Sequence, residues 1–208
     1  MKRRLFAILF LLTSHKLLAQ DAENFCRVMR LLFNEAKAGF STYRAEKSDI
    51  KDTSLHQYLV KPELIANSEF SSAYIYLDAD FLEYPLYDWE DKLPVKGNRL
   101  VLRTSKLGNF TGGKQDSMIV KRFIGAVDRI YQDCFKGYHK LSEKGQNTFF
   151  SKEVLRYVVS QEDLSDKYTD RDYQKSMNKP VVIFVLSDEL SDRNAYMEIT
   201  FEYAMRKD

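Results

Sequence analysis

Apolar residues recur every three or four positions between Asp116 and Phe135, and charged residues occupy the positions between them. This spacing places the apolar side chains on one face of an α-helix. Asp116 or Ser117 offers an oxygen acceptor to the first-turn N–H groups, and Gly137 suits the left-handed conformation that commonly ends a helix. The pattern predicts an amphipathic helix whose apolar face comprises Met118, Ile119, Phe123, Val127, Ile130 and Cys134.

A second helical pattern covers residues 21–38, with Asp21 at its start and Gly39 just after its end. Asp is a favourable N-cap residue and glycine a favourable C-cap residue. The apolar face of this predicted first helix comprises Ala22, Cys26, Met29, Phe33 and Ala36.

The remaining hydrophobic patterns are short and predict β-strands. Residues 197–205 alternate most regularly, with Met197, Ile199 and Phe201 on one side and Glu198 and Thr200 on the other. A continuous apolar run at 181–186 predicts a buried strand that pairs antiparallel with 197–205. Further strands are predicted at 41–47, 55–60, 73–77, 99–104 and 154–160, and loops at 78–91, 138–148 and 161–179.

The resulting order is a helix, several strands, a helix and several strands. Strands in runs predict an α+β fold with two amphipathic helices packed on one face of a mainly antiparallel sheet. No internal sequence repeat is visible. The order resembles that of chaperone-like and TATA-binding-protein-like α+β folds, and a resemblance of order alone implies no activity.

Residues 1–20 have the pattern of a secretory signal peptide, in which Lys2, Arg3 and Arg4 precede the apolar run 5–12. That run is too short to span a bilayer, which needs about 20 apolar residues in a helix. We therefore expect an exported, periplasmic or secreted bacterial-type protein with residues 21–208 as a single domain and no transmembrane segment.

Removal of the leader changes the charge of the chain. The 208 residues carry 32 basic and 30 acidic side chains, and the leader contains four of the basic ones and none of the acidic ones. The mature chain then has a slight acidic excess, which gives no support for nucleic-acid binding.

The chain has two cysteines, Cys26 and Cys134, one on each predicted helix. An exported protein meets an oxidising compartment, so we predict that they form a disulfide, brought together by antiparallel packing of the helices. Two buried free thiols are the alternative, since cysteine packs well as a small apolar residue.

Residues 108–114 match the G-x-x-x-x-G-K pattern of a phosphate-binding loop and precede a predicted helix. Gln115 occupies the position where such loops place the Ser or Thr that binds magnesium. The surrounding pattern is antiparallel rather than doubly wound. Nucleotide binding by Gly108–Lys114 is therefore a remote alternative.

Catalytic motifs are absent from the sequence. There is no G-x-S-x-G elbow and no His or Cys spacing typical of a metal site, and His56 and His139 lie in polar surroundings. We expect no cofactor and no metal. Acidic residues cluster at 78–83 and 163–172, and two converging carboxylates would permit glycosidase-like chemistry; solvated charge is the simpler interpretation.

The segment from Tyr84 to Trp89 concentrates aromatic residues around Pro85. Tyr84, Tyr87 and Trp89 could stack on a sugar ring or anchor a protein interface, and alternatively could fold back onto the core. We expect an exported non-catalytic protein that binds a protein or small ligand, with an exported carboxylate hydrolase as the alternative.

Overall fold

Nine β-strands form one sheet in the computed structural model, which describes residues 23–47, 56–65, 70–80, 95–104, 106–143, 151–163 and 178–206. Every described strand pair is antiparallel, so the predicted mainly antiparallel sheet is confirmed. The strands are β1 (Arg44–Lys47), β2 (His56–Val60), β3 (Phe70–Asp80), β4 (Val95–Thr104), β5 (Gly108–Asn109), β6 (His139–Glu143), β7 (Ser151–Ser160), β8 (Pro180–Glu189) and β9 (Asn194–Arg206).

Two longer helices accompany the sheet. The first helix occupies residues 23–35 and continues into the 3-10 turn η1 (Ala36–Ala38). The second, α3, spans Lys114–Cys134, so the predicted central helix is confirmed with its start two residues earlier. Gly39 follows η1 in the left-handed conformation, with φ of 66°, as the prediction of a glycine C-cap requires.

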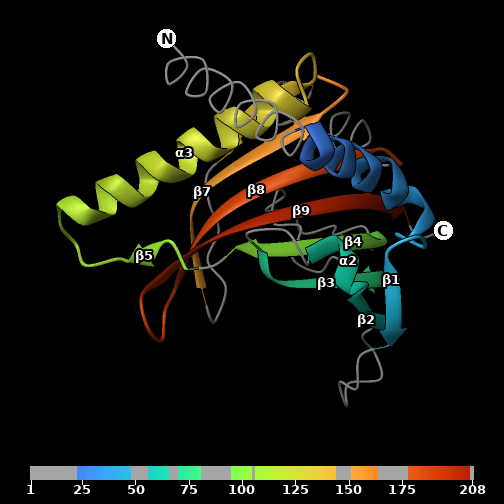
Figure 1. Cartoon of the computed structure of the whole chain (residues 1–208), viewed down its shortest axis with the longest axis horizontal. Helices are drawn as coiled ribbons and strands as arrows, with labels where there is room; N and C mark the ends of the chain where they lie inside the picture. The colour runs from blue at the N-terminus through green and yellow to red at the C-terminus, as the bar shows by residue number, and fades with distance from the viewer. Residues whose placement is uncertain are drawn as a thin grey trace, which may run out of the picture.

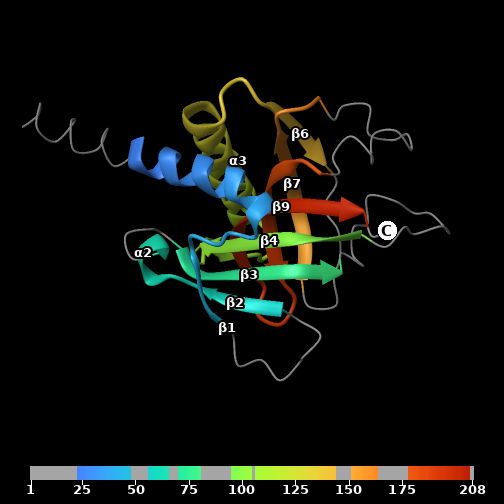
Figure 2. The same cartoon turned by 90° about the vertical axis from the view of Figure 1, so that its right-hand side faces the viewer.

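The strand order divides the sheet into two halves with the same plan. The order is β1-β2-β3-β4-β9-β8-β7-β6, and β5 pairs with β9 outside this path. The first helix precedes the meander β1–β4, and α3 precedes the meander β6–β9. The halves therefore meet where the last strand of each, β4 and β9, pair with one another (Figures 1 and 2). The two halves share this helix-and-meander plan although the sequence contains no visible internal repeat.

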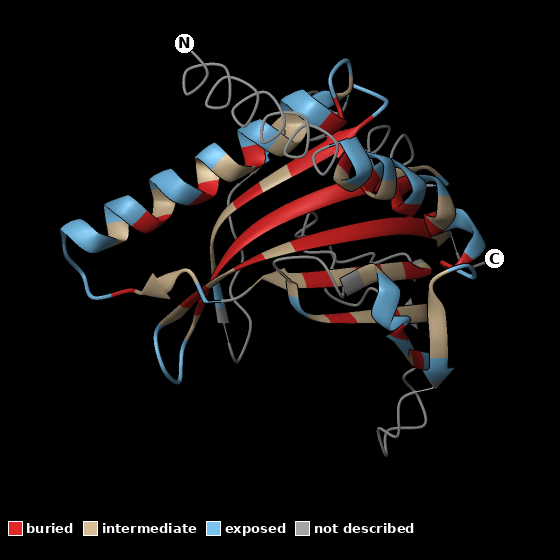
Figure 3. Cartoon of the chain, in the orientation of Figure 1, coloured by how far each residue is buried: buried red, intermediate tan, exposed pale blue. Residues whose placement is uncertain are grey.

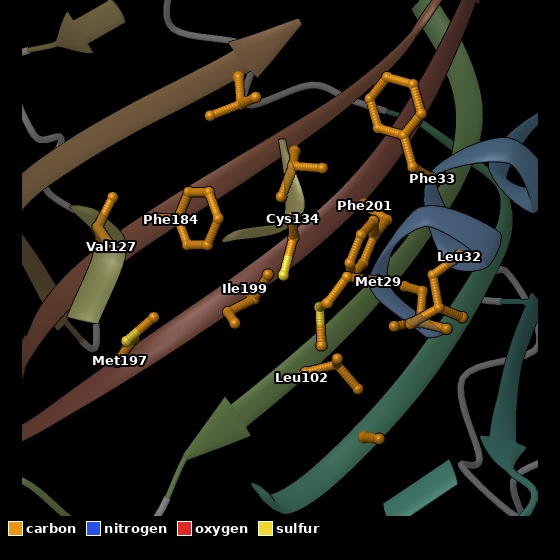
Figure 4. Packing of buried hydrophobic residues seen from close by; sticks show 14 of the residues in the cluster. Met29, Leu32, Phe33, Leu102, Val127, Cys134, Phe184, Met197, Ile199 and Phe201 are labelled. Carbon is orange, nitrogen blue, oxygen red and sulfur yellow. The ribbon is translucent and has the colours of Figure 1, made fainter. Parts of the chain in front are cut away.

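The main core lies on one face of the sheet, which we call the inner face. Figure 3 shows buried residues along β8 and β9 and on the sides of both helices that face the sheet. Figure 4 shows side chains of the first helix, α3, β4, β8 and β9 packed together. This single cluster includes Met29, Leu32 and Phe33 with Phe123, Val127, Leu102, Phe184, Ile199 and Phe201.

The predicted disulfide is present. Cys26 and Cys134 are bonded, with their Cα atoms 4.7 Å apart, and both side chains are buried. In Figure 1 the last turn of α3 lies beside the early turns of the first helix, and the two helices follow one another across the sheet. The bond therefore joins the end of one helix to the beginning of the other, and with them the two halves of the fold.

The side chain of Asn98 on β4 is hydrogen-bonded to the 3-10 turn η1. Its Nδ2 donates to the carbonyl oxygens of Ala36 and Lys37 at 3.1 and 3.4 Å, and its side chain is buried. Carbonyls at a helix end lack partners within the helix. The side chain of a β4 residue thus satisfies the end of the helical segment that precedes β1.

Two predictions of local structure were wrong. Residues 139–143 were predicted to be loop because they are polar, yet they form the edge strand β6, which pairs with β7. The predicted strand at 55–60 is confirmed as β2, and Pro62 after it begins the short helix α2 (Pro62–Ile65), as proline at a first helical position allows. The predicted 78–91 loop begins too early, since β3 continues to Asp80. The predicted pairing of β8 with β9 is confirmed, with a shorter turn at 190–193.

Candidate functional site

The face opposite the main core, which we call the outer face, carries the charged residues of the central strands. Side chains alternate between the two faces along a strand. Since Leu100, Leu102, Ile199 and Phe201 belong to the core, the side chains between them lie on the outer face. All described helices contribute buried or partly buried side chains to the main core. The outer-face set at the β4–β9 junction is Arg99, Val101, Arg103, Glu198, Thr200 and Glu202.

Arg99 and Glu202 form a buried ion pair at this junction. They are direct cross-strand neighbours, and Arg99 Nε lies 2.7 Å from Glu202 Oε1. The Glu202 side chain is 2% exposed, whereas Arg99 is partly exposed. A buried carboxylate needs a partner, because its desolvation otherwise costs several kcal/mol. Arg99 therefore both neutralises Glu202 and reaches the surface.

Arg103, four residues after Arg99 on β4, contacts two carboxylates and an aromatic ring. Its Nε lies 3.2 Å from Glu198 Oε1 and its Nη2 lies 3.6 Å from Glu189 Oε1. Its guanidinium carbon lies 4.0 Å from the centre of the Tyr196 ring, in a cation–π arrangement. These contacts fix the guanidinium in one place, which lowers the entropy that a ligand contact would cost.

Glu198 is the described acid whose pKa is raised. Burial raises its pKa above the ordinary glutamate value, and Glu153 and Glu189 add to this effect. Arg103 and Arg99 act in the opposite direction. Several acids therefore share a limited number of arginines at this end of the outer face.

Apolar and aromatic side chains of β2, β3 and β4 extend across the sheet at the level of Val101, which lies between Arg99 and Arg103 on β4. Leu59 on β2, Tyr74 on β3 and Val101 on β4 are successive cross-strand neighbours. Leu59 is 45% exposed, and Tyr74 and Val101 are partly exposed. Leu59, Tyr74, Tyr76, Arg99, Val101 and Arg103 together form what we call the exposed row of the outer face.

A polar pair borders this row on β2 and β3. Gln57 is 4% exposed, and its Nε2 donates a hydrogen bond to the Tyr76 hydroxyl at 3.1 Å. Its Oε1 is buried and has no donor among the residues that the structure describes. Burial raises the pKa of Tyr76, so this hydroxyl stays protonated.

The outer face of β7 and β8 is different, because it is apolar. Val158, Val181, Ile183 and Val185 form a separate buried cluster there, with Leu141 of β6 packed against it. Beside it, Arg156 Nη1 lies 3.3 Å from Glu153 Oε2. Partly exposed polar side chains of the described outer face include Tyr74 and Tyr76 on β3, Arg99 and Arg103 on β4, and Glu198 on β9.

The backbone of the glycine-containing segment Gly108–Lys114 is hydrogen-bonded to the carboxylate of Asp116, which follows the segment on α3. The Asp116 side chain accepts hydrogen bonds from the backbone N–H groups of Thr111 and Gly112 at 2.8 and 2.9 Å. These bonds, that of Thr111 first, lower the pKa of Asp116. In a phosphate-binding loop such N–H groups would face the phosphate. Here the Asp116 carboxylate of α3 already accepts hydrogen bonds from these N–H groups, which argues against nucleotide binding.

The residues singled out in the sequence lie apart from the outer-face junction or outside the description. Tyr84, Tyr87 and Trp89 fall within 81–94, outside the described residues, and remain a prediction. His56 on β2 and His139 on β6 are exposed. Within the described ranges there is no group of three or more His, Cys, Asp or Glu placed to hold a metal ion. No helix of the described segments has the length and apolarity to cross a membrane.

Sequence patterns predict only the acidic strand of the outer-face site. The alternation at 197–205 correctly separates Glu198, Thr200 and Glu202 from the apolar residues. It does not reveal that β4, about a hundred residues earlier, supplies Arg99 and Arg103 as their partners.

Comparison of the chain with protein-family models, with curated proteins and with solved structures found no match.

Proposed function

We propose that the chain is an exported, non-catalytic binding protein and that the exposed row of the outer face contacts its partner. The leader-like residues 1–20 and the disulfide support export to an oxidising compartment, periplasmic or extracellular. Partly exposed side chains on the outer face of β3 and β4, together with the exposed Leu59 of β2, would be the part of that face available to the partner.

The composition of the exposed row carries this proposal. Tyrosine and arginine are enriched among the residues that dominate binding energy, and Leu59 supplies apolar area among them. Arg99 and Arg103 are held by Glu202 and Glu198, so they are ordered before a partner arrives. Preorganisation of this kind converts more of the contact energy into affinity.

A pair of matched substitutions tests the site. Leu59→Glu places a charge in the exposed row, whereas Met118→Glu places one on α3, where Met118 is 55% exposed. We expect extracts of the native envelope to contain a component that binds the wild-type protein and the Met118→Glu variant equally well. Leu59→Glu should weaken the binding of this component at least about tenfold. Equal binding by both variants would exclude the exposed row as the contact surface.

A carboxylate hydrolase is the second candidate, supported by Glu198. Its raised pKa beside Glu189 and Glu153 is a feature of carboxyl groups that act as general acids. Turnover of glycoside substrates that falls about a hundredfold or more in Glu198→Gln would favour this candidate over non-catalytic binding. Absence of turnover in the wild-type protein would leave binding as the function.

A further inference from the structure

The two helices carry exposed basic side chains on the side that points away from the sheet. Figure 3 shows exposed residues along that side of both the first helix and α3. The exposed basic residues of these helices, which we call the basic helix surface, are Arg27, Arg30, Lys114, Lys121, Arg122 and Arg129. The exposed acids of the same helices are only Glu23, Asp128 and Asp133. Positive charge is therefore concentrated on the helices, although residues 21–208 as a whole have a slight acidic excess.

These basic side chains differ from the arginines of the outer face in their lack of acidic partners. On the outer face Arg99, Arg103 and Arg156 each form an ion pair with a glutamate. Among the residues that the structure describes, no ion pair includes a member of the basic helix surface. Asp128, an exposed acid of α3, pairs instead with Lys140 of β6. The positive charge of the helices is thus available to an anionic partner.

The basic positions are spread along both helices rather than gathered at one point. α3 has 21 residues and is about 30 Å long at a rise of 1.5 Å per residue. Lys114 begins this helix and Arg129 lies in its last two turns. The disulfide joins Cys134 at the end of α3 to Cys26, which precedes Arg27 on the first helix. This spread suits a partner that is itself negative over a wide area, since a small anion is bound where several donors converge on it.

An exposed apolar side chain on the first helix favours a lipid surface over a water-soluble polyanion. Leu31 is 40% exposed and lies one helical turn after Arg27, on the same side of the helix. Helices that lie at a membrane interface place apolar side chains in the headgroup region beside basic ones. A hydrated polyanion offers no comparable apolar environment for Leu31.

We infer that the basic helix surface attaches the protein peripherally to a membrane that contains anionic phospholipids. This inference goes beyond the proposed function and does not depend on it, because the helices and the exposed row lie on opposite faces of the sheet. Attachment through the helices leaves the exposed row pointing away from the lipid. Each basic side chain near an anionic bilayer adds to the attraction, and salt screens it.

Co-sedimentation with vesicles tests the inference. The oxidised protein is used without the leader-like residues 1–20, whose apolar run could itself enter a bilayer, and all described residues lie within 21–208. The probes are vesicles of phosphatidylcholine alone and vesicles in which about a third of the lipid is phosphatidylglycerol. We expect at least about tenfold tighter binding to the anionic vesicles, lost in about 1 M salt. Equal binding to both kinds of vesicle, or binding to neither, would overturn the inference.

Neutralising substitutions locate the contact on the helices. Lys121→Gln/Arg129→Gln on α3 and Arg27→Gln/Arg30→Gln on the first helix should each weaken binding to the anionic vesicles about tenfold. Two independent pairs keep the test decisive if one variant fails to fold.

The matched control removes the same number of charges from the remainder of the molecule. Lys106 lies between β4 and β5 and Lys152 on β7, and both are exposed. Lys106→Gln/Lys152→Gln should change the binding less than about twofold. If this control weakened binding as much as the helix pairs, or if neither helix pair weakened it, the basic helix surface would not be the contact.

Leu31→Ser distinguishes a lipid surface from a soluble polyanion, for which dextran sulfate is the probe. The substitution should weaken vesicle binding about fivefold, because it removes an apolar contact, and should not affect binding to dextran sulfate. Unchanged vesicle binding by Leu31→Ser, together with tighter binding of dextran sulfate than of the vesicles, would identify a polyanion as the partner and overturn the lipid inference.

Discussion

Arg99 and Glu202 lie directly opposite each other on β4 and β9, with Arg99 Nε 2.7 Å from Glu202 Oε1. Because β4 ends the first half of the fold and β9 ends the second, this ion pair crosses the junction between the halves. The same junction carries Arg103 with Glu198. The polar residues of the candidate site therefore also join the two structural units.

Glu202→Ala should lower the free energy of unfolding by about 2 kcal/mol. Removing one partner of a buried pair costs about 3–5 kcal/mol, and the partial exposure of Arg99 reduces this cost because water can solvate the remaining charge. Asp128→Ala is the control, since Asp128 is 53% exposed in its pair with Lys140 and should cost at most about 1 kcal/mol. Urea unfolding of the two variants measures the difference, and equal losses would contradict the buried role of Glu202.

Removal of the Cys26–Cys134 disulfide should destabilise the protein by up to about 4 kcal/mol. The bond closes a loop of 108 residues, which restricts the unfolded chain, and it also connects the first helix with α3. Cys26→Ala/Cys134→Ala should unfold at a lower denaturant concentration than the oxidised protein and become insensitive to reductant. A reductant effect that persists in the double variant would refute this origin of the stability.

Two glycine-to-alanine substitutions should have opposite effects. Gly39 has φ of 66°, and an added Cβ would lie 2.9 Å from Leu77 Cδ2, so Gly39→Ala should cost about 1–2 kcal/mol. Gly125 lies inside α3 with open space around its missing Cβ, so Gly125→Ala should stabilise by about 0.5–1 kcal/mol. Thermal unfolding reports both signs, and a stabilising Gly39→Ala would contradict the left-handed cap.

The pKa shifts of Glu198 and Asp116 predict opposite dependences of stability on pH. Burial raises the pKa of Glu198, so its stabilising contribution is complete below the ordinary value of 4.5 and is lost as pH rises through the raised pKa. Glu198→Gln should therefore gain stability relative to the wild-type protein as pH increases over this window.

Asp116 provides the matched case of opposite sign. Hydrogen bonds from Thr111 and Gly112 lower its pKa, so its contribution is present above the ordinary value of 3.8 and is lost as pH falls through the lowered pKa. Asp116→Asn should be less stable than the wild-type protein at neutral pH and approach it in acid. Parallel pH profiles for the two variants would show that these environments do not differ as described.

Much of the secondary structure follows from local pattern. The three- and four-residue spacing around Phe123 predicted α3, and the alternation around Ile199 predicted β9, since each element buries one face. The edge strand β6 could not be recognised in this way. Its sequence, His139–Glu143, has one apolar residue, Leu141, and its strand conformation is set by hydrogen bonding to β7.

By itself the sequence determined the two amphipathic helices, the main strands, the α+β class and the choice of cysteines for the disulfide. These depend on periodicity within short segments and on residue type. Only the tertiary structure decided that two helix-and-meander halves meet at β4 and β9, and that Arg99 and Arg103 lie opposite Glu202 and Glu198. Strand order and register are set by packing between segments far apart in the chain, and local hydrophobic patterns contain no information about which distant strand becomes the neighbour.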